Sequence, residues 1–303
     1  MIQRPNNFYS MQQLLAKAQT GGFAVGAFSP RYLPMIRAVF RAAEKTQSPV
    51  LLQIAQVETQ WFNHSNADFA AAFWEQFDEV KPSVPVGLHL DHTQDFDLIV
   101  EAIEVGFNSV MIDASALPLE KNINETKKVV AYAHEHGVSV EAELGRIGEG
   151  DFGENAVDDQ LFTDPAEAAY FVAQTGVDAL AVSVGTAHGV YNVRQPHVDL
   201  ERIQAIRSKT NIPLVLHGGS GTPADMIRKA IQLPGGGISK VNIATDLELG
   251  LLTALGLKER TTDTAVSRLP EKEFAIACDA VQAVVEDKIQ HFLFSAGHAA
   301  DYY

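Results

Sequence analysis

Three histidines follow short apolar runs of the sequence, at points where a buried strand would end. His92 closes VGLHLDH, His217 opens HGGSG, and His188 stands in GTAHGVY. Any one of them alone is more often a core or surface residue than a metal ligand. Together, three imidazoles with an open fourth position are the ligand set of a catalytic zinc. A structural zinc site built from cysteines is excluded, because the chain has one cysteine.

Asp91 directly precedes His92 at the end of the same apolar run. A buried carboxylate needs a partner, and beside a metal it can stay ionised and act as a general base and then as an acid. The alternative is an acceptor that only orients a histidine. His89 shares the face of Asp91 but lies deeper, so we expect it to pack or donate a hydrogen bond rather than to bind metal.

Further carboxylates follow the neighbouring apolar runs, namely Asp113, Glu141 and Glu143. Glu141 and Glu143 alternate onto one face of their run. Carboxylates this close together require cations, either one metal with a second metal or a monovalent ion beside it. The alternative is ion pairing with Lys240 or Arg146.

A glycine-containing segment, HGGSG, stands before a helical pattern, and VNIAT ends the last apolar run. Backbone amides at a helix N-terminus bind anions, and barrels commonly hold a phosphate in their last two βα loops. GGSG alone is weak evidence, because turns use the same residues.

Eight apolar runs and the helical patterns between them must position these residues. Each run is typical of a buried parallel strand. Strand and helix alternate with a repeat of roughly 30 residues, which predicts an α/β fold, a (β/α)8 TIM barrel, with a doubly wound open sheet as the alternative. In a barrel, chemistry is done at the C-terminal edge of the strands. The expected strands are 23–28, 49–55, 86–92, 109–115, 138–144, 179–185, 213–219 and 239–245.

Helix starts and domain limits can also be predicted. Asp164 and Thr222 each precede a proline, the pattern of a cap at a helix start. The sequence lacks a linker rich in proline, glycine or serine, so we expect one domain over 1–303. A C-terminal helical extension, about 258–303, exceeds what a barrel needs and is expected to cover a barrel end or serve a subunit interface.

The composition narrows the partners. The chain has 303 residues and a formal net charge of −15, which repels nucleic acid and anionic membranes. Its apolar runs are shorter than the roughly 20 residues that a membrane helix needs. The first residues lack the apolar core of a signal peptide, so we expect a cytoplasmic protein.

The motifs, taken in order, resemble those of the class II, metal-dependent ketose-bisphosphate aldolases, which include fructose- and tagatose-bisphosphate aldolases. The resemblance covers nearly the whole chain and implies cleavage of a ketose 1-phosphate or ketose 1,6-bisphosphate to dihydroxyacetone phosphate and an aldehyde. It also implies a homodimer or homotetramer. The motifs are HLDH (89–92), MIDAS (111–115), VEAELG (140–145), GTAHGVY (185–191), LHGGSG (216–221) and KVNIAT (240–245).

The resemblance implies roles for single residues. His92, His188 and His217 match the catalytic zinc ligands, and Asp91 matches the proton donor and acceptor. Positions that can hold a second divalent metal are Asp113 and Glu143. The matches to the phosphate cradle, where Na⁺ or K⁺ can also sit, are Gly189, Gly218, Gly219, Ser220, Asn242, Ile243, Ala244 and Thr245.

Several departures from the family pattern bear on the substrate. The family arginine that holds the second phosphate in a neighbouring subunit's site is Glu271 here, a charge reversal that costs several kcal/mol of binding to a dianion. We therefore expect a second phosphate to be dispensable. Asp151 replaces the catalytic glutamate of the expected lid, 145–160. Ser29, where the family has asparagine, and Gln53 are expected to contact the substrate.

Three alternatives stay open on sequence grounds. The nearest is an ordinary fructose- or tagatose-1,6-bisphosphate aldolase, with Arg31 or Lys272 holding the second phosphate. A barrel hydrolase is disfavoured, because the first expected strand ends FAVGAFS without a histidine pair. A non-catalytic sugar-phosphate sensor is disfavoured by the intact Asp91 and histidines.

Overall fold

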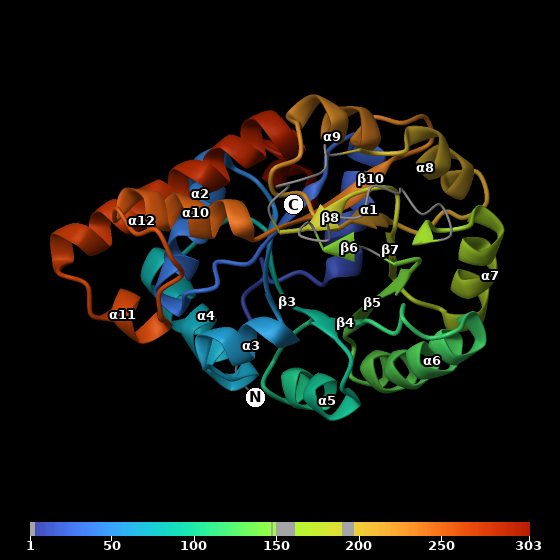
Figure 1. Ribbon diagram of the computed structural model, residues 1–303, viewed down its shortest axis with the longest axis horizontal. Coiled ribbons are helices and arrows are strands. Elements are labelled where there is room, and N and C mark those ends of the chain that lie inside the picture. Colours follow the sequence, from blue (N-terminus) through green and yellow to red (C-terminus); the bar gives the residue numbers. More distant parts are fainter. Residues whose placement is uncertain (1–3, 147, 150–160, 190–196) are drawn as a thin grey trace.

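Eight parallel strands close into a barrel in the computed structural model of this protein (Figure 1). The structure describes residues 4–146, 148–149, 161–189 and 197–303, without the side chains of 148, 149 and 188. The barrel strands are β1 (Val25–Phe28), β2 (Val50–Ala55), β3 (Val86–Thr93), β4 (Ser109–Ile112), β5 (Ser139–Leu144), β7 (Ala179–Val182), β9 (Leu214–Leu216) and β10 (Ile238–Ile243).

Helices surround the barrel, as the ring of coiled ribbons in Figure 1 shows. They are α1 (Met11–Gly21), α2 (Ile36–Thr46), α3 (Gln56–Phe62), α4 (Asn66–Val80), α5 (Phe96–Glu104), α6 (Leu119–Glu135), α7 (Pro165–Thr175), α8 (Leu200–Arg207), α9 (Ala224–Ile231), α10 (Thr245–Ala254), α11 (Asp263–Ser267) and α12 (Glu271–Asp287). Shorter helical turns are η1 (Leu33–Met35), η3 (Lys288–Leu293) and η4 (His298–Tyr302).

Closure of the sheet confirms the predicted (β/α)8 barrel. β1 pairs in parallel with both β2 and β10, so the first and last strands meet and the sheet has no open edge. This pairing excludes the doubly wound open sheet. Because all strands run the same way, their carboxyl ends share one rim of the barrel, the edge where this fold places chemistry.

The amino end of the barrel is closed by apolar packing. Leu14 and Leu15 of α1 are fully buried in a cluster with interior residues of the strands, among them Val25 and Val215. The C-terminal residues pack against the same end of the barrel, since the Tyr302 hydroxyl donates to the Leu14 carbonyl at 2.7 Å. The functional residues are therefore left to the opposite end.

Two predicted helix caps have different outcomes. Asp164 caps α7 as predicted, and its Oδ1 accepts from the amides of Ala166 and Glu167 at 2.7 and 2.9 Å. The cap at Thr222 is wrong, because Pro223 is the N-cap of α9. The Thr222 hydroxyl instead donates to the Gly218 carbonyl at 3.1 Å and so braces the glycine loop.

The C-terminal extension packs on the outside of the barrel. α12 lies against α2 and α10, with α11 beyond them at the far left of Figure 1. Among the described helices, none is long and apolar enough to cross a membrane. The single domain expected over 1–303 stays a prediction.

Candidate active site

The carboxyl ends of four strands bring predicted residues to one edge of the barrel. Asp91 and His92 stand near the end of β3, and Asp113 follows β4. Glu143 is the second-last residue of β5, and His217 follows β9. Asp91, Glu143 and His217 are buried, while His92 and Asp113 are partly exposed. The structure therefore gathers these five residues from four separate parts of the sequence.

A bulge in β3 turns His92 toward His217. The register between β3 and β4 shifts between Leu90 and Thr93, and His92 has a φ of 35°, a left-handed conformation rare for a residue with a side chain. The rings of His92 and His217 lie 4.4 Å apart between centroids, at 70°. Such strain is characteristic of functional sites.

Asp113 fixes the imidazole of His92. Its Oδ2 lies 2.9 Å from Nδ1 of His92, while its Oδ1 accepts from the Ser115 hydroxyl at 2.7 Å. Burial would lower the pKa of His92, but the charges of Asp91 and Asp113 raise it to about 10. With Nδ1 directed at Asp113, Nε2 is the nitrogen oriented to ligate a metal.

Two glutamates of β5 flank His217. Nε2 of His217 lies 2.9 Å from Oε1 of Glu141, and Nδ1 lies 3.3 Å from Oε2 of Glu143. Burial and the charge of His92 act to lower the pKa of His217, but the two carboxylates raise it above its ordinary value. Nδ1 is therefore the nitrogen directed toward Glu143.

Two side-chain amides hold Asp91. Nδ2 of Asn242 donates to both carboxylate oxygens, at 3.0 and 3.1 Å, and Nε2 of Gln53 donates to Oδ2 at 3.1 Å. Burial acts to raise the pKa of Asp91, but the charges of His92 and Lys240 lower it below its ordinary value. Asp91 is thus held as a carboxylate, the form that a general base requires.

The donor set fits a divalent metal. Asp91, His92 and His217 form one group whose ligand atoms lie within 4.8 Å of one another, and His92, Asp113 and Glu143 form another. Oε2 of Glu143 is buried, with Nδ1 of His217 at 3.3 Å. Imidazole nitrogens with carboxylate oxygens are the ligands that zinc takes in catalytic sites.

Two predicted residues fall partly or wholly outside this description. His188 belongs to β8 (Ala187–His188), which pairs with β6 (Gly148–Glu149) in a separate two-stranded sheet, but its side chain lies outside the described residues. Asp151 and most of the expected lid also lie outside them. Their roles stay predictions.

The predicted phosphate cradle is built from two loops tied together. The Gly219 amide donates to the Asn242 carbonyl at 3.1 Å, and the Asp246 amide donates to the Ser220 hydroxyl at 3.2 Å. Gly218 has a φ of 69°, and a Cβ there would lie 2.2 Å from the Ala187 carbonyl oxygen. Of the remaining predicted residues of the cradle, Ile243 ends β10, while Ala244 caps α10 and Thr245 begins it. Gly189 is exposed and follows β8.

An ion-pair network that the sequence analysis missed stands beside the site. The Ser29 hydroxyl donates to Oε2 of Glu58 at 2.5 Å, and the buried Arg31 pairs with both Glu58 and Glu248. Glu248 also pairs with Arg260. Glu58 and Glu248 stand in the first turns of α3 and α10. The sequence analysis looked for polar residues at strand ends, and including the first turn of the following helix would have found both glutamates.

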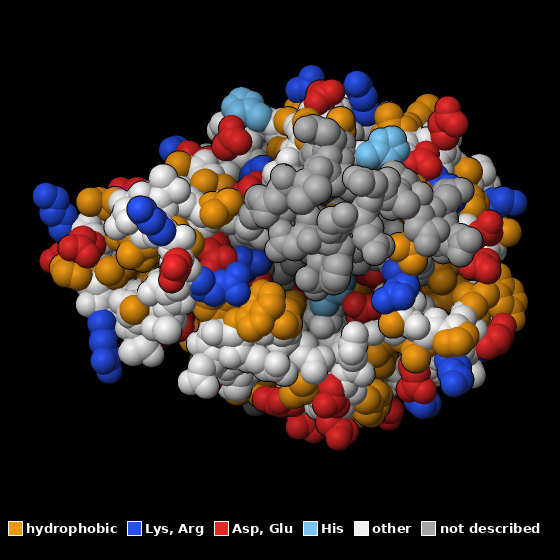
Figure 2. Space-filling model, viewed as in Figure 1, with side chains coloured by type: hydrophobic (Ala, Val, Ile, Leu, Met, Phe, Trp, Pro, Cys, Tyr) orange, Lys and Arg blue, Asp and Glu red, His pale blue; other side chains and the backbone are white. Residues whose placement is uncertain are grey.

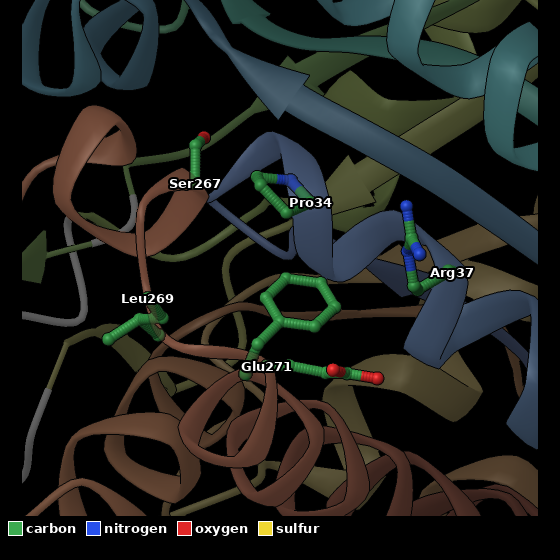
Figure 3. A pocket seen from close by; sticks show the side chains of 6 residues that line it. Pro34, Arg37, Ser267, Leu269 and Glu271 are labelled. Carbon is green, nitrogen blue, oxygen red and sulfur yellow. The ribbon is translucent and has the colours of Figure 1, made fainter.

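Glu271 is the first residue of α12, on the outside of the barrel. It lines a pocket of about 410 Å³ with Arg37 and Leu269, between η1–α2 and α11–α12 (Figure 3). The lining lacks histidine, so this pocket is not the candidate metal centre.

Figure 2 shows the face seen in Figure 1, where acidic and basic side chains are interspersed around the visible rim and a histidine is visible near the centre.

A closed (β/α)8 barrel with histidines and carboxylates at the carboxyl edge of its strands is the architecture of a metal-dependent barrel enzyme. Comparison with known proteins narrows this class. The family model for class II fructose-bisphosphate aldolase matches residues 9–298. The chain therefore belongs to the class II fructose-bisphosphate aldolase family, whose members are metal-dependent lyases.

Individual relatives agree with this assignment. The chain is 36% identical to the probable fructose-bisphosphate aldolase of Bacillus subtilis, over 93% of this chain and 96% of that protein. It is 37% identical to the fructose-bisphosphate aldolase of Geobacillus stearothermophilus, over 96% and 98%. The crystal structure of the YdjI aldolase from Escherichia coli K12 superposes with a TM-score of 0.79 at 31% identity, covering 96% of this chain and 99% of that one.

Proposed function

We propose that this protein cleaves a ketose 1-phosphate reversibly to dihydroxyacetone phosphate and an aldehyde, in a zinc-dependent retro-aldol reaction. The observation that carries the proposal is the place of Asp91, a buried carboxylate whose oxygen lies within 4.8 Å of ligand nitrogens of His92 and His217. The two amides of Gln53 and Asn242 hold it. A proton acceptor beside a metal centre is what retro-aldol cleavage requires.

Asp91 is the residue that moves the proton. In the cleavage direction its carboxylate accepts the proton of the C4 hydroxyl, the C3–C4 bond breaks, and C4 leaves as the aldehyde carbon. The electron pair of that bond passes to the ketone half, and Asp91, now an acid, returns its proton to C3, which completes dihydroxyacetone phosphate and restores the carboxylate. Gln53 and Asn242 orient the Asp91 carboxylate, and the substrate contact expected for Gln53 stays a prediction.

The chain's own imidazoles and carboxylates would hold the metal. His92, His188 and His217 would hold the catalytic zinc, while Asp113 and Glu143 with His92 are the group for a second divalent ion. When bound, zinc acts as a Lewis acid that polarises the ketone and stabilises the negative charge developing on its oxygen. A Na⁺ or K⁺ ion in the phosphate cradle remains a prediction from the family resemblance.

The loop after β9 and the start of α10 bind the substrate phosphate. Gly218 and Gly219 bring no side chain into this loop, although the Gly219 amide itself donates to the Asn242 carbonyl, and α10 begins at Thr245. A helix N-terminus adds a partial positive charge. Anchoring the phosphate fixes the reacting carbons beside Asp91.

The second phosphate is not required in this proposal. Arg31, one cation expected to replace the family arginine, is buried and already paired with two carboxylates, Glu58 and Glu248. Glu271 brings a negative charge to the position of that arginine. The alternative is cleavage of fructose or tagatose 1,6-bisphosphate, and the two relatives named as fructose-bisphosphate aldolases favour the fructose substrate.

A coupled assay for released dihydroxyacetone phosphate separates these alternatives. Matched ketose 1-phosphates and 1,6-bisphosphates are compared with and without a chelator. The proposal expects chelator-sensitive release and a kcat/KM for the best monophosphate at least equal to that for any bisphosphate. A much larger kcat/KM for fructose 1,6-bisphosphate would contradict the specificity and leave the reaction class standing.

The quaternary structure and the location of the protein stay predictions from the sequence. A homodimer or homotetramer follows from the family resemblance, and analytical ultracentrifugation at micromolar concentration measures it. A cytoplasmic location is a prediction from the single cysteine.

A further inference from the structure

A buried ion pair lies inside the barrel below the candidate metal centre. Nζ of Lys240, on β10, is 2.8 Å from Oε2 of Glu141, on β5, and both side chains are 0% exposed. Moving two charges out of water is costly, and replacing such a pair with apolar residues is often neutral or even stabilising. Stability alone therefore does not account for this pair.

The second oxygen of Glu141 reaches the candidate metal ligand His217. Oε1 lies 2.9 Å from Nε2 of His217, so Glu141 joins Lys240 on one side to His217 on the other. Burial would raise the pKa of Glu141, but Lys240 and His217 lower it well below its ordinary value. A carboxylate bound at both oxygens, by Lys240 of β10 and by His217 directly after β9, has one orientation.

His89 closes the lower side of the same cluster. Its Nε2 lies 3.5 Å from Nζ of Lys240 and 3.7 Å from Oε2 of Glu141, and its Nδ1 lies 2.8 Å from the Ser109 hydroxyl. His89, Asp91 and Glu141 are spaced closely enough to hold a cation. The ammonium of Lys240 supplies a positive charge beside this group, so balancing its carboxylates does not require a metal.

We infer that Lys240 and Glu141 are positioning residues for the metal centre. The Lys240 ammonium fixes Glu141, and Glu141 holds the His217 imidazole with Nδ1 directed toward Glu143. The inference rests on the proposed function, in which His217 is a zinc ligand. Outer partners of ligating histidines fix the ring and its tautomer, and losing them typically weakens metal binding about 10–100-fold.

The test is the zinc dissociation constant of the full-length protein, measured by competition with a chromogenic chelator. Lys240→Met and Glu141→Gln should each weaken zinc binding about 10–100-fold. In the double variant the loss should be smaller than the product of the two single losses, because the residues act as one unit. The double variant also removes both buried charges, so it keeps the test open where a single variant does not fold.

Arg207→Met is the matched control. Arg207 is likewise a buried cation, but its guanidinium donates to the carbonyls of Thr210, Ile212 and Gly236, before β9 and β10 at the amino edge of the barrel. This variant should lower the melting temperature and leave the zinc dissociation constant within about twofold. A loss of zinc affinity equal to that of Lys240→Met would overturn the inference, since it would make the effect one of general destabilisation.

His217→Ala separates this inference from the proposed function. Wild-type protein that does not bind zinc, or a His217→Ala variant that binds it as tightly as wild type, contradicts the proposed function itself. If His217→Ala loses zinc while Lys240→Met and the double variant bind it as wild type does, the positioning role is wrong and the metal centre stands. A visible absorption spectrum of the cobalt-substituted protein gives a second readout, expected to change in Lys240→Met and not in Arg207→Met.

Discussion

Asn242 donates from one amide nitrogen to both carboxylate oxygens of Asp91, at 3.0 and 3.1 Å. Asn242 belongs to β10 and Asp91 to β3, and the two residues are 151 positions apart in the chain. This contact fixes the plane of the Asp91 carboxylate at the carboxyl edge of the barrel. It also favours the ionised form, because both oxygens of a carboxylate accept strongly, and hydrogen bonds donated to the charged form stabilise it.

Asp91→Asn should remove the proton acceptor while keeping the metal. We expect kcat to fall about 10²–10⁴-fold, the usual contribution of a positioned base, with zinc content unchanged. The coupled assay and metal analysis measure the two effects. Asp97→Asn, an exposed substitution in the first turn of α5, is the control and should keep wild-type kcat.

Metal removal should abolish activity reversibly. Protein dialysed against a strong chelator should lose aldol cleavage, because the charge on the ketone oxygen is no longer stabilised. Added zinc should restore it in wild type but not in His92→Ala. Undiminished turnover by protein shown to be metal-free would argue against the metal-dependent mechanism.

Gly218→Ala should damage the phosphate loop. Its left-handed φ of 69° and the Ala187 oxygen, 2.2 Å from the Cβ position, leave no room for a methyl group. The loop must shift, so KM for a ketose 1-phosphate should rise about tenfold or more, equivalent to about 1.4 kcal/mol of binding.

Gly137 provides a matched control, with a φ of 70° and nothing within 4 Å. Gly137→Ala should keep KM and cost about 1 kcal/mol of stability; equal KM changes in both variants would rule out this role for the loop.

Glu248→Gln should make stability less dependent on pH. Burial acts to raise the pKa of Glu248, but the hydrogen bond from Arg260 and the charge of Arg31 lower it. A lowered pKa means that the stabilisation is present above the unfolded value, about 4.3, and is lost as the pH falls through the folded value. The variant should lose about 3 kcal/mol of unfolding free energy at pH 7, as expected when a buried pair is broken.

Urea unfolding of wild type and variant between pH 7 and pH 3.5 measures this difference. The gap between the two free energies should narrow as the pH falls below about 4. Glu79→Gln, which breaks the more exposed pair with Arg37, should cost less than about 1 kcal/mol. A gap that is constant across this range would show that the Glu248 charge is not the cause.

The fold was predictable because strand and helix patterns alternate clearly. The apolar runs correspond to β1–β5, β7, β9 and β10, and ends differ by a few residues. The small β6–β8 sheet was not predicted, since two-residue strands leave no periodic signal. Thr222 was misjudged as a cap, because the same hydroxyl could reach either the helix amides or the Gly218 carbonyl, and only tertiary packing decides between them.

The candidate site was predictable as a set of residues on one edge, but not as a set of contacts. The strand-end rule placed Asp91, His92 and His217 on the same rim. It could not show that a bulge turns His92, because a register shift depends on the partner strand. For Glu141, the sequence left metal binding and pairing with Lys240 open, and the structure has the pair at 2.8 Å.

The central claim is that imidazoles from distant parts of the chain bind one zinc ion beside Asp91. X-ray absorption at the zinc edge of the zinc-loaded protein tests it most directly. We predict nitrogen neighbours at about 2.0–2.1 Å and outer-shell scattering from three imidazole rings. Each of His92→Ala, His188→Ala and His217→Ala should remove one ring. A spectrum without imidazole scattering, or one that none of these substitutions changes, would contradict the account.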